Sequence, residues 1–190
     1  MKPFAAWLAE VLDQEPCEVE KLLKSDRAVH ILMAWSLFES RCSSQVSRDQ
    51  PNGGLIGAKT LQPLVEWMAT DCGFDPARIN AAVRYVYDRY QNERRFLHLV
   101  HRRRLGDIDS GAQRFRALLL VRFEKLTASD QLYLVLFTAY RYRNNIFHGN
   151  KGVSSWLQYD EQIEICTTVL QEFLTHIESL QRTLALTRES

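Results

Sequence analysis

One short segment of this chain collects side chains that can bind a phosphate group and move a proton. Residues 143–151 read Arg-Asn-Asn-Ile-Phe-His-Gly-Asn-Lys. A guanidinium stabilises negative charge that builds on phosphorus oxygens, and an imidazole exchanges protons near neutral pH. Arg143 and His148, with Asn144 as a polar neighbour, therefore have the residue types that metal-free cleavage of a phosphodiester requires.

The spacing of these residues places them on one end of a helix. The apolar pattern before them predicts a helix, and residues four apart share a helical face, so Asn144 lies over His148. Arg143 is turned away by about 100° and reaches across with its flexible stem. His148 in the last turn feels the negative end of the helix dipole, and Gly149 is suited to end the helix there.

Cleavage of RNA by internal attack of a 2′-hydroxyl needs a group that transfers protons and a cation that holds the developing charge. His148 and Arg143 suit these two roles without a metal ion or another cofactor. Asn144 can either orient the imidazole or donate a hydrogen bond to the phosphate. One copy of Arg143, Asn144 and His148 offers few groups for this reaction, so we expect the segments of two chains to meet across a two-fold axis.

The elements that must position this segment are helices. Helical periodicity extends along the whole chain, and we find no alternating strand pattern of useful length and no internal repeat. We expect one domain, 1–190, that forms an all-α, up-and-down bundle with additional short N-terminal helices. The last two helices are expected to form an antiparallel pair. Residues 43–58 are polar and rich in glycine, which predicts a flexible loop.

Capping residues and glycines predict where individual helices begin and end. The helix that begins at Pro76 can continue as far as Arg104, and a later one extends from about Phe115 to Phe123. Gly73 is expected to close the helix before Pro76. The predicted N-terminal caps are Ser25 or Asp26, Thr60, and Ser129 or Asp130. Two further helices are predicted to begin at Asp75-Pro76 and at Asp160.

Composition limits the classes of function. The chain has 190 residues, of which 46% are hydrophobic, so it can bury a sizeable core. Its 24 Lys and Arg against 23 Asp and Glu leave a net charge of +1, so any site for a polyanion must be a local patch. No apolar run is long enough to span a bilayer and no signal-peptide pattern occurs, so we expect a cytoplasmic protein without a membrane partner.

The cysteines do not suggest a disulfide framework or a zinc site. They lie far apart, without the Cys-x-x-Cys spacing, and we interpret them as reduced and mostly buried thiols. They are Cys17, Cys42, Cys72 and Cys166.

Residues 143–149 resemble the signature of the HEPN superfamily, in which an arginine, a polar residue, a short spacer and a histidine stand near the end of a helix. The resemblance covers about residues 130–151 and extends to the rest of the chain only in fold class. It implies a small all-α bundle that acts as a metal-independent endoribonuclease, with an active site composed across a homodimer. By this resemblance the catalytic residues are Arg143, Asn144 and His148.

The resemblance also implies biological roles and supporting residues. HEPN proteins include toxins of toxin–antitoxin pairs, phage-defence nucleases and RNA-processing modules, so an antitoxin or another regulatory protein is an expected partner beside RNA. Asn145, Gly149 and Lys151 flank the catalytic positions and are expected to support them. The alternative is a non-catalytic HEPN-like module that binds RNA, nucleotides or another protein.

Glu39 is a second candidate from the family pattern. It lies in the segment Trp-Ser-Leu-Phe-Glu-Ser-Arg at 35–41, and in some HEPN branches an acidic residue on an early helix comes near the active site. Glu39 is therefore a candidate for positioning Arg143 or His148. The alternative is an exposed or structurally paired glutamate beside a core Trp-Phe face.

The densest basic patch is a candidate RNA-binding surface. Phosphate contacts from such a patch steer RNA toward a cleavage site, whereas the alternative is a solvated helix face. His98 and His101 belong to it, but we find no third ligand that would make them a metal site. The predicted RNA-binding residues are Arg94, Arg95, Arg102, Arg103, Arg104 and Arg141.

Overall fold

The computed structural model describes residues 26–46, 56–58, 60–147 and 159–188, with isolated positions at 6, 9, 15, 17, 19 and 20. Within these ranges the regular elements are helices and no strand occurs, so the predicted all-α class is confirmed. None of the described helices is both long enough and apolar enough to cross a lipid bilayer. The predicted N-terminal helices and most of the 43–58 loop lie outside the described residues.

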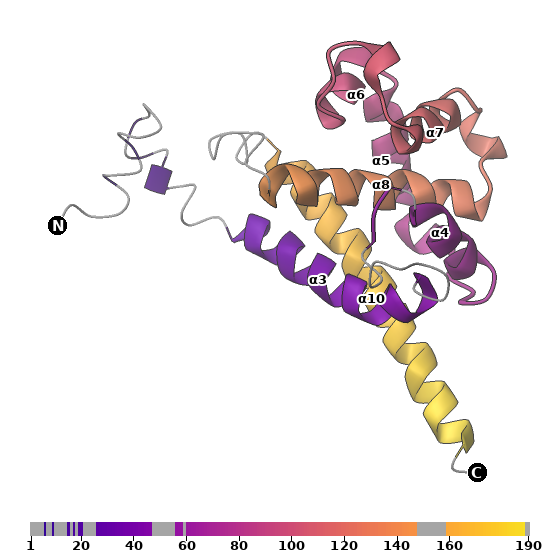
Figure 1. The fold of residues 1–190 in the computed structure, drawn as a ribbon. Helices are drawn as coiled ribbons and strands as arrows, with labels where there is room; N and C mark the ends of the chain where they lie inside the picture. The colour runs from indigo at the N-terminus through magenta and orange to yellow at the C-terminus, as the bar shows by residue number, and fades with distance from the viewer. Residues whose placement is uncertain are drawn as a thin grey trace.

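Three long helices form the frame of the molecule: α3 (Arg27–Val46), α8 (Ala128–Phe147) and α10 (Asp160–Arg188) (Figure 1). Shorter helices complete the fold. They are α4 (Leu61–Ala69), η2 (Pro76–Ile79), α5 (Asn80–Tyr90), α6 (Glu93–Leu99), η3 (Leu105–Asp107), α7 (Ser110–Leu119) and η4 (Phe123–Lys125).

Helix α10 runs alongside α3 in the same direction. Near the start of both helices, Arg27 Nη1 lies 2.7 Å from Asp160 Oδ2, and farther along both, Arg41 Nη2 lies 3.9 Å from Glu178 Oε1. The most extensive partner of α10 is thus α3 rather than α8. Helix α10 also contacts α8, the helix with which the sequence predicts an antiparallel pair.

Helix α8 occupies the centre because it is apolar on almost every side. The side chains of 132–137 are all buried, which a helix with a single core-facing stripe would not show. Its surface is covered by α4, α5, α7 and α10, and it also contacts α3 and α6. Figure 1 shows α8 between α3 and the group formed by α5, α6 and α7. The central position of α8 accounts for the burial of these side chains.

Several predicted helix boundaries are confirmed. Helix α10 begins at Asp160, and Gly73 adopts a φ of 63° after α4. The carboxylate of Asp75 accepts a hydrogen bond from the backbone N–H of Ala77 and caps η2, whose first residue is Pro76. These signals act within one turn of the chain, which is why the local sequence reveals them.

Other boundaries differ from the predictions for identifiable reasons. Helix α8 starts at Ala128 because Thr127 and Asp130 form a capping box: the N–H of Asp130 donates to Thr127 Oγ1 at 3.2 Å and the N–H of Thr127 donates to Asp130 Oδ2 at 3.1 Å. Thr60 precedes α4 as predicted, but its hydroxyl bonds with Gly57 instead of the first turn of α4.

The helix from Pro76 does not continue to Arg104. Helix α5 ends at Tyr90, and Asn92 starts α6 by accepting a hydrogen bond from the N–H of Arg95 at 3.1 Å. Helix α7 ends at Leu119, so Phe123 belongs to η4. Helix α3 extends to Val46 and so includes the first residues of the predicted loop, 43–46.

The prediction that most of the cysteines are buried is confirmed: Cys42, Cys72 and Cys166 are buried, whereas Cys17 is exposed.

Candidate functional site

Arg143 near the end of α8 is held by two neighbours. Its Nη2 lies 3.5 Å from Glu39 Oε2, and its Nη1 donates a hydrogen bond to Asn144 Oδ1 at 2.8 Å. The side chains of Arg143 and Glu39 are only 24% and 16% exposed. A flexible cation held at two of its nitrogens in a half-buried position has a restricted orientation. The structure therefore brings together three of the residues that the sequence singled out.

The packing of α3 on α8 explains why Glu39 reaches Arg143. Trp35 is buried between the two helices, with its ring 6.0 Å from that of Tyr140 on α8. Glu39 follows Trp35 by one helical turn and Arg143 follows Tyr140 by almost one turn, so each charged residue shares a face with its aromatic neighbour. The aromatic contact and the Glu39–Arg143 ion pair thus join the same two helices within one turn of each other.

Asn145 and Arg141 lie on the other side of α8 and bind the end of α6. Asn145 is buried and its Nδ2 donates to the carbonyl of Leu99 at 3.4 Å. Arg141 Nη2 donates to the carbonyl of Val100 at 2.6 Å, and Nη1 lies 3.3 Å from Asp109 Oδ2. Burial lowers the pKa of the Arg141 guanidinium, and Asp109 acts in the opposite direction. These contacts attach α6 to α8, and RNA binding by Arg141 stays a prediction.

Two buried tyrosines fasten the same end of α8 to α5 and α10. The hydroxyls of Tyr90 and Tyr142 lie 3.1 Å apart, and burial raises the pKa of both. The ring of Tyr142 lies 5.6 Å from that of Tyr159, just before α10, and the hydroxyl of Tyr159 lies 2.6 Å from His98 Nδ1 on α6. Sequence reasoning did not single out Tyr159, because no local signal reveals a contact between segments so far apart.

Part of the predicted catalytic segment follows the last described turn of α8. His148, Gly149 and Lys151 lie outside the described residues, and Phe147 is the last described residue of α8. Their predicted roles in proton transfer, helix termination and support therefore stay predictions.

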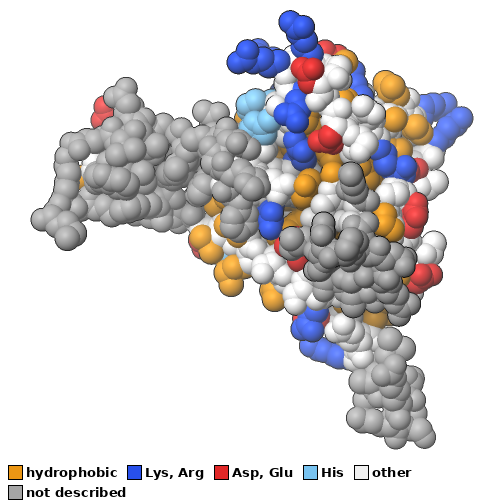
Figure 2. Space-filling model, viewed as in Figure 1, with side chains coloured by type: hydrophobic (Ala, Val, Ile, Leu, Met, Phe, Trp, Pro, Cys, Tyr) orange, Lys and Arg blue, Asp and Glu red, His pale blue; other side chains and the backbone are white. Residues whose placement is uncertain are grey.

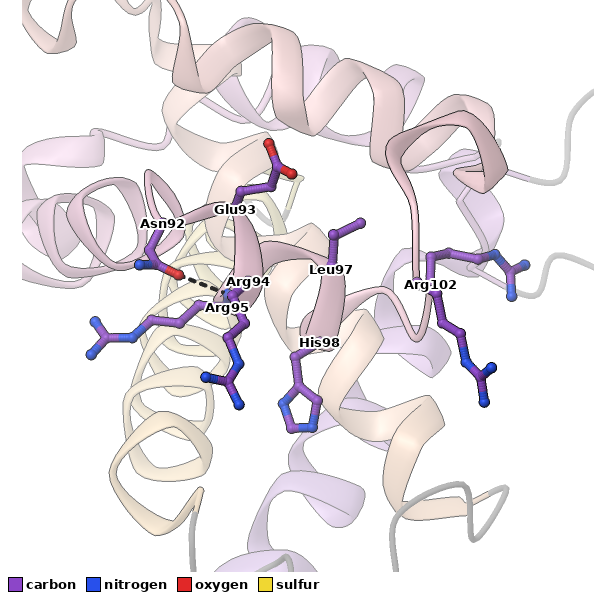
Figure 3. A pocket seen from close by; sticks show the side chains of 8 residues that line it. Asn92, Glu93, Arg94, Arg95, Leu97, His98 and Arg102 are labelled. Carbon is purple, nitrogen blue, oxygen red and sulfur yellow. Dashed lines mark hydrogen bonds between the residues drawn. The ribbon is translucent and has the colours of Figure 1, made fainter.

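The basic patch at α6 forms a pocket of about 740 Å³. Arg94, Arg95, Arg102 and Arg103 line it, together with His98 (Figure 3). Arg104 is exposed beside it and is not among the lining residues. Figure 2 shows Lys, Arg and His side chains gathered over the end of the molecule that α6 forms. The patch is thus a hollow surface attached to the same end of α8.

No family model, curated protein or solved structure matches this chain. The resemblance to HEPN proteins therefore rests on the residues of the α8 segment. Within the described ranges, no three or more His, Cys, Asp or Glu side chains are arranged to hold a metal ion.

Proposed function

We propose that the protein is a metal-independent endoribonuclease of the HEPN type, with Arg143, Asn144 and His148 in its active site. The observation that carries the proposal is the fixed guanidinium of Arg143, bound by Glu39 and Asn144 at the end of α8. A cation oriented before the substrate arrives stabilises the charge of the transition state without reorganising during the reaction. Because residues 143–149 resemble the HEPN signature, we extend the proposal to a toxin or phage-defence effector that an antitoxin or regulatory protein restrains.

The proposed reaction transfers the phosphoryl group within the RNA strand. The 2′-oxygen forms a bond to the adjacent phosphorus while its proton passes to the imidazole of His148. The bond between phosphorus and the 5′-oxygen breaks, and the imidazolium of a second copy of His148 donates a proton to that leaving oxygen. Arg143 stabilises the negative charge on the other phosphorus oxygens. The products carry a 2′,3′-cyclic phosphate and a 5′-hydroxyl.

A second copy of the chain is part of this proposal, and an exposed apolar stripe on α3 supports it. Val29, Met33 and Leu37 follow one another at intervals of one turn and are 53%, 61% and 54% exposed. Figure 2 shows apolar side chains along the edge of the molecule where α3 lies. A self-complementary stripe of this kind suits an isologous contact between two copies. Met33→Glu is expected to shift the protein from dimer to monomer in analytical ultracentrifugation, whereas a wild-type monomer would contradict the pairing.

One observation favours the alternative, a module that binds RNA without cleaving it. The charge of Arg143 is already paired with Glu39, whereas the arginines of the α6 pocket are exposed. If the ion pair with Glu39 serves only the fold, phosphate binding at the pocket is the principal activity. His148→Ala then leaves RNA binding unchanged and no cleavage is seen in the wild type.

The test is cleavage of a mixed RNA pool by purified protein in the presence of EDTA. Wild type is compared with His148→Ala and Arg143→Ala, and the matched control is Arg78→Ala. Arg78 also pairs with a glutamate across helices, with its Nη2 2.8 Å from Glu172 Oε2. Thermal unfolding checks that each variant folds.

The proposal expects chelator-resistant cleavage that both site variants lose by about 100-fold or more and that Arg78→Ala retains. It also expects 5′-hydroxyl ends. Products with 5′-phosphate ends, loss of cleavage in EDTA, or full activity of folded His148→Ala would each overturn it.

A further inference from the structure

The pocket beside α6 has a strongly positive lining. Its walls are Asn92, Glu93, Arg94, Arg95, Leu97, His98, Arg102 and Arg103. The one carboxylate among them belongs to Glu93, which Figure 3 shows turned away from His98. Glu93 Oε2 lies 3.5 Å from Arg116 Nη2 on α7, so its charge is already paired. The lining therefore presents four guanidinium groups without a carboxylate of its own to balance them.

The positive charges of the pocket are not balanced by the described surroundings either. Among the described residues, no carboxylate lies within ion-pair distance of Arg94, Arg95 or Arg103. The side chain of Arg102 is positioned by backbone oxygen, since its Nε donates to the carbonyl of Asp107 at 2.9 Å. Like charges held close together repel one another, and an anion in the pocket relieves this repulsion.

A reversal of the chain at His101 gives the pocket its two sides. The N–H of Arg102 donates to the carbonyl of Leu97 at 3.0 Å and the N–H of His101 donates to the carbonyl of His98 at 3.4 Å. This Schellman motif ends α6, and His101 has a φ of 52°, a conformation that a non-glycine residue adopts only at a cost. The reversal sets Arg102 on one side of His98, while Arg94 and Arg95 lie on the other (Figure 3).

The pocket is fixed to the candidate active-site helix. His98 is held by the hydroxyl of Tyr159, and Leu99 and Val100 are bound by Asn145 and Arg141 of α8. Asn145 and Arg141 are four residues apart and share a face, whereas Arg143 lies on the face toward α3. The pocket and the Glu39–Arg143 pair thus flank the same end of α8.

We infer that this pocket binds the phosphates of a single-stranded RNA and holds the strand beside the end of α8. Arginines on two sides of His98 suit two successive phosphodiesters better than one phosphate group. A volume of about 740 Å³ is ample for the linking sugar and base. The choice of RNA rests on the proposed function, whereas the binding of phosphate rests on the pocket alone.

The test measures binding in a His148→Ala background, so that cleavage does not consume the probe. The probe is a fluorescein-labelled single-stranded RNA of about twelve nucleotides without a terminal phosphate, followed by fluorescence anisotropy. Arg95→Gln with Arg103→Gln removes two charges from the pocket. The matched control, Arg122→Gln with Arg182→Gln, removes two exposed charges that do not line it.

We expect the pocket variant to raise Kd by about tenfold or more and the control variant by less than about twofold. The slope of log K against log salt is expected to fall by about 1.4 in the pocket variant, since each phosphate on a single strand contributes about 0.7. Equal weakening in both variants, or no binding by the parent protein, would overturn the inference. AMP or ATP that displaces the RNA at concentrations near the protein's would also overturn it, because a mononucleotide would then be the ligand.

The failure of this inference differs from the failure of the proposed function. If RNA binding depends on the pocket and the wild type does not cleave RNA, the pocket binds RNA and the nuclease proposal is wrong. If the wild type cleaves RNA and the pocket and control variants bind RNA equally well, the nuclease proposal holds and RNA binding by the pocket is wrong.

Discussion

Glu39 Oε2 on α3 lies 3.5 Å from Arg143 Nη2 on α8, and both side chains are largely withdrawn from water. The position of the candidate catalytic cation therefore depends on a helix that is remote in sequence. Because Asn144 accepts a hydrogen bond from the same guanidinium, Arg143 is held by both its own helix and α3. If Arg143 binds the scissile phosphate, Glu39 is a positioning residue that acts through it.

Glu39→Gln is expected to lower cleavage by about tenfold while the protein stays folded, since the amide keeps the shape of the side chain but holds the guanidinium less firmly. The free energy of unfolding is expected to fall by about 1 kcal/mol, because a partly buried charge-assisted contact is lost. RNA cleavage rates and urea unfolding measure the two effects. The matched control is Glu178→Gln, whose carboxylate pairs with Arg41 at 3.9 Å on an exposed surface.

A purely structural role for Glu39 makes a different prediction. Cleavage would then fall only in proportion to the unfolded fraction, and lowering the temperature would restore it. A rate that stays low in folded Glu39→Gln protein, with unchanged RNA affinity, identifies positioning of Arg143. An unchanged cleavage rate in Glu39→Gln would show that Glu39 does not position Arg143 for catalysis.

His101 and Gly73 both have positive φ values, of 52° and 63°. Substitutions at these two positions are therefore expected to change the stability of the fold in opposite directions. His101→Gly is expected to stabilise the fold by about 1 kcal/mol, because glycine adopts this conformation without strain. Gly73→Ala is expected to destabilise it by about 1 kcal/mol; no atom lies within 4 Å of the added Cβ, so the cost is conformational. Thermal and urea unfolding of both variants provide the measurement. Destabilisation by His101→Gly would show that its side chain contributes more than the strain costs.

The buried hydrogen bond between Tyr90 and Tyr142 is expected to contribute measurably to stability. Tyr90→Phe and Tyr142→Phe should each lower the free energy of unfolding by about 1–2 kcal/mol, because each change deprives the other hydroxyl of this bond. The double variant is expected to lose less than the sum of the two. Urea unfolding of the four proteins gives the coupling energy. Strict additivity would mean that the two hydroxyls stabilise the fold independently.

Stability is expected to fall in alkaline solution because of buried tyrosines and thiols. Burial raises the pKa of Tyr133 to about 12 and, with a smaller contribution from Cys72, that of Cys42 to about 12. Unfolded tyrosines and thiols titrate near 10 and 8.5, so above these values the unfolded chain loses protons that the folded chain keeps. The contribution of each such group to the free energy of unfolding is therefore fully present below its unfolded pKa. It decreases by about 1.4 kcal/mol per pH unit as the pH rises from the unfolded pKa toward the folded pKa.

Urea unfolding at several pH values between about 7 and 11 measures this loss, and ultraviolet absorbance shows when tyrosines ionise. We expect Tyr133→Phe to flatten the slope above about pH 10. A constant free energy of unfolding over this range would show that the groups ionise equally well in the folded protein.

Helix signals within a few residues of one another predicted much of the fold. Asp75 with Pro76, Gly73 and Asp160 mark the boundaries that the sequence indicates, because a cap or a left-handed glycine acts on its own turn. The break after Tyr90 was missed because the apolar pattern continues through Phe96, while the cap at Asn92 is a single polar residue. A continuous apolar pattern concealed the boundary between two separate helices.

The candidate site was predicted as a set of residues but not as an arrangement. The motif at the end of α8 singled out Arg143 and Asn144, and the family pattern suggested Glu39. Neither indicated that Asn144 would bind Arg143, or that Asn145 would bind the carbonyl of Leu99 instead. Adjacent amides on one helix point about 100° apart, so their partners depend on which helices cover each side.

Periodicity and capping signals predicted the helical class, several helix starts and the burial of three thiols, because both kinds of signal are local. Packing between distant segments makes α10 run parallel to α3, brings Glu39 to Arg143, and places two groups of arginines around one pocket where the chain reverses at His101. These relationships depend on how side chains from distant segments fit together when they are buried. Patterns within a few residues of the sequence therefore do not reveal how these side chains pack together.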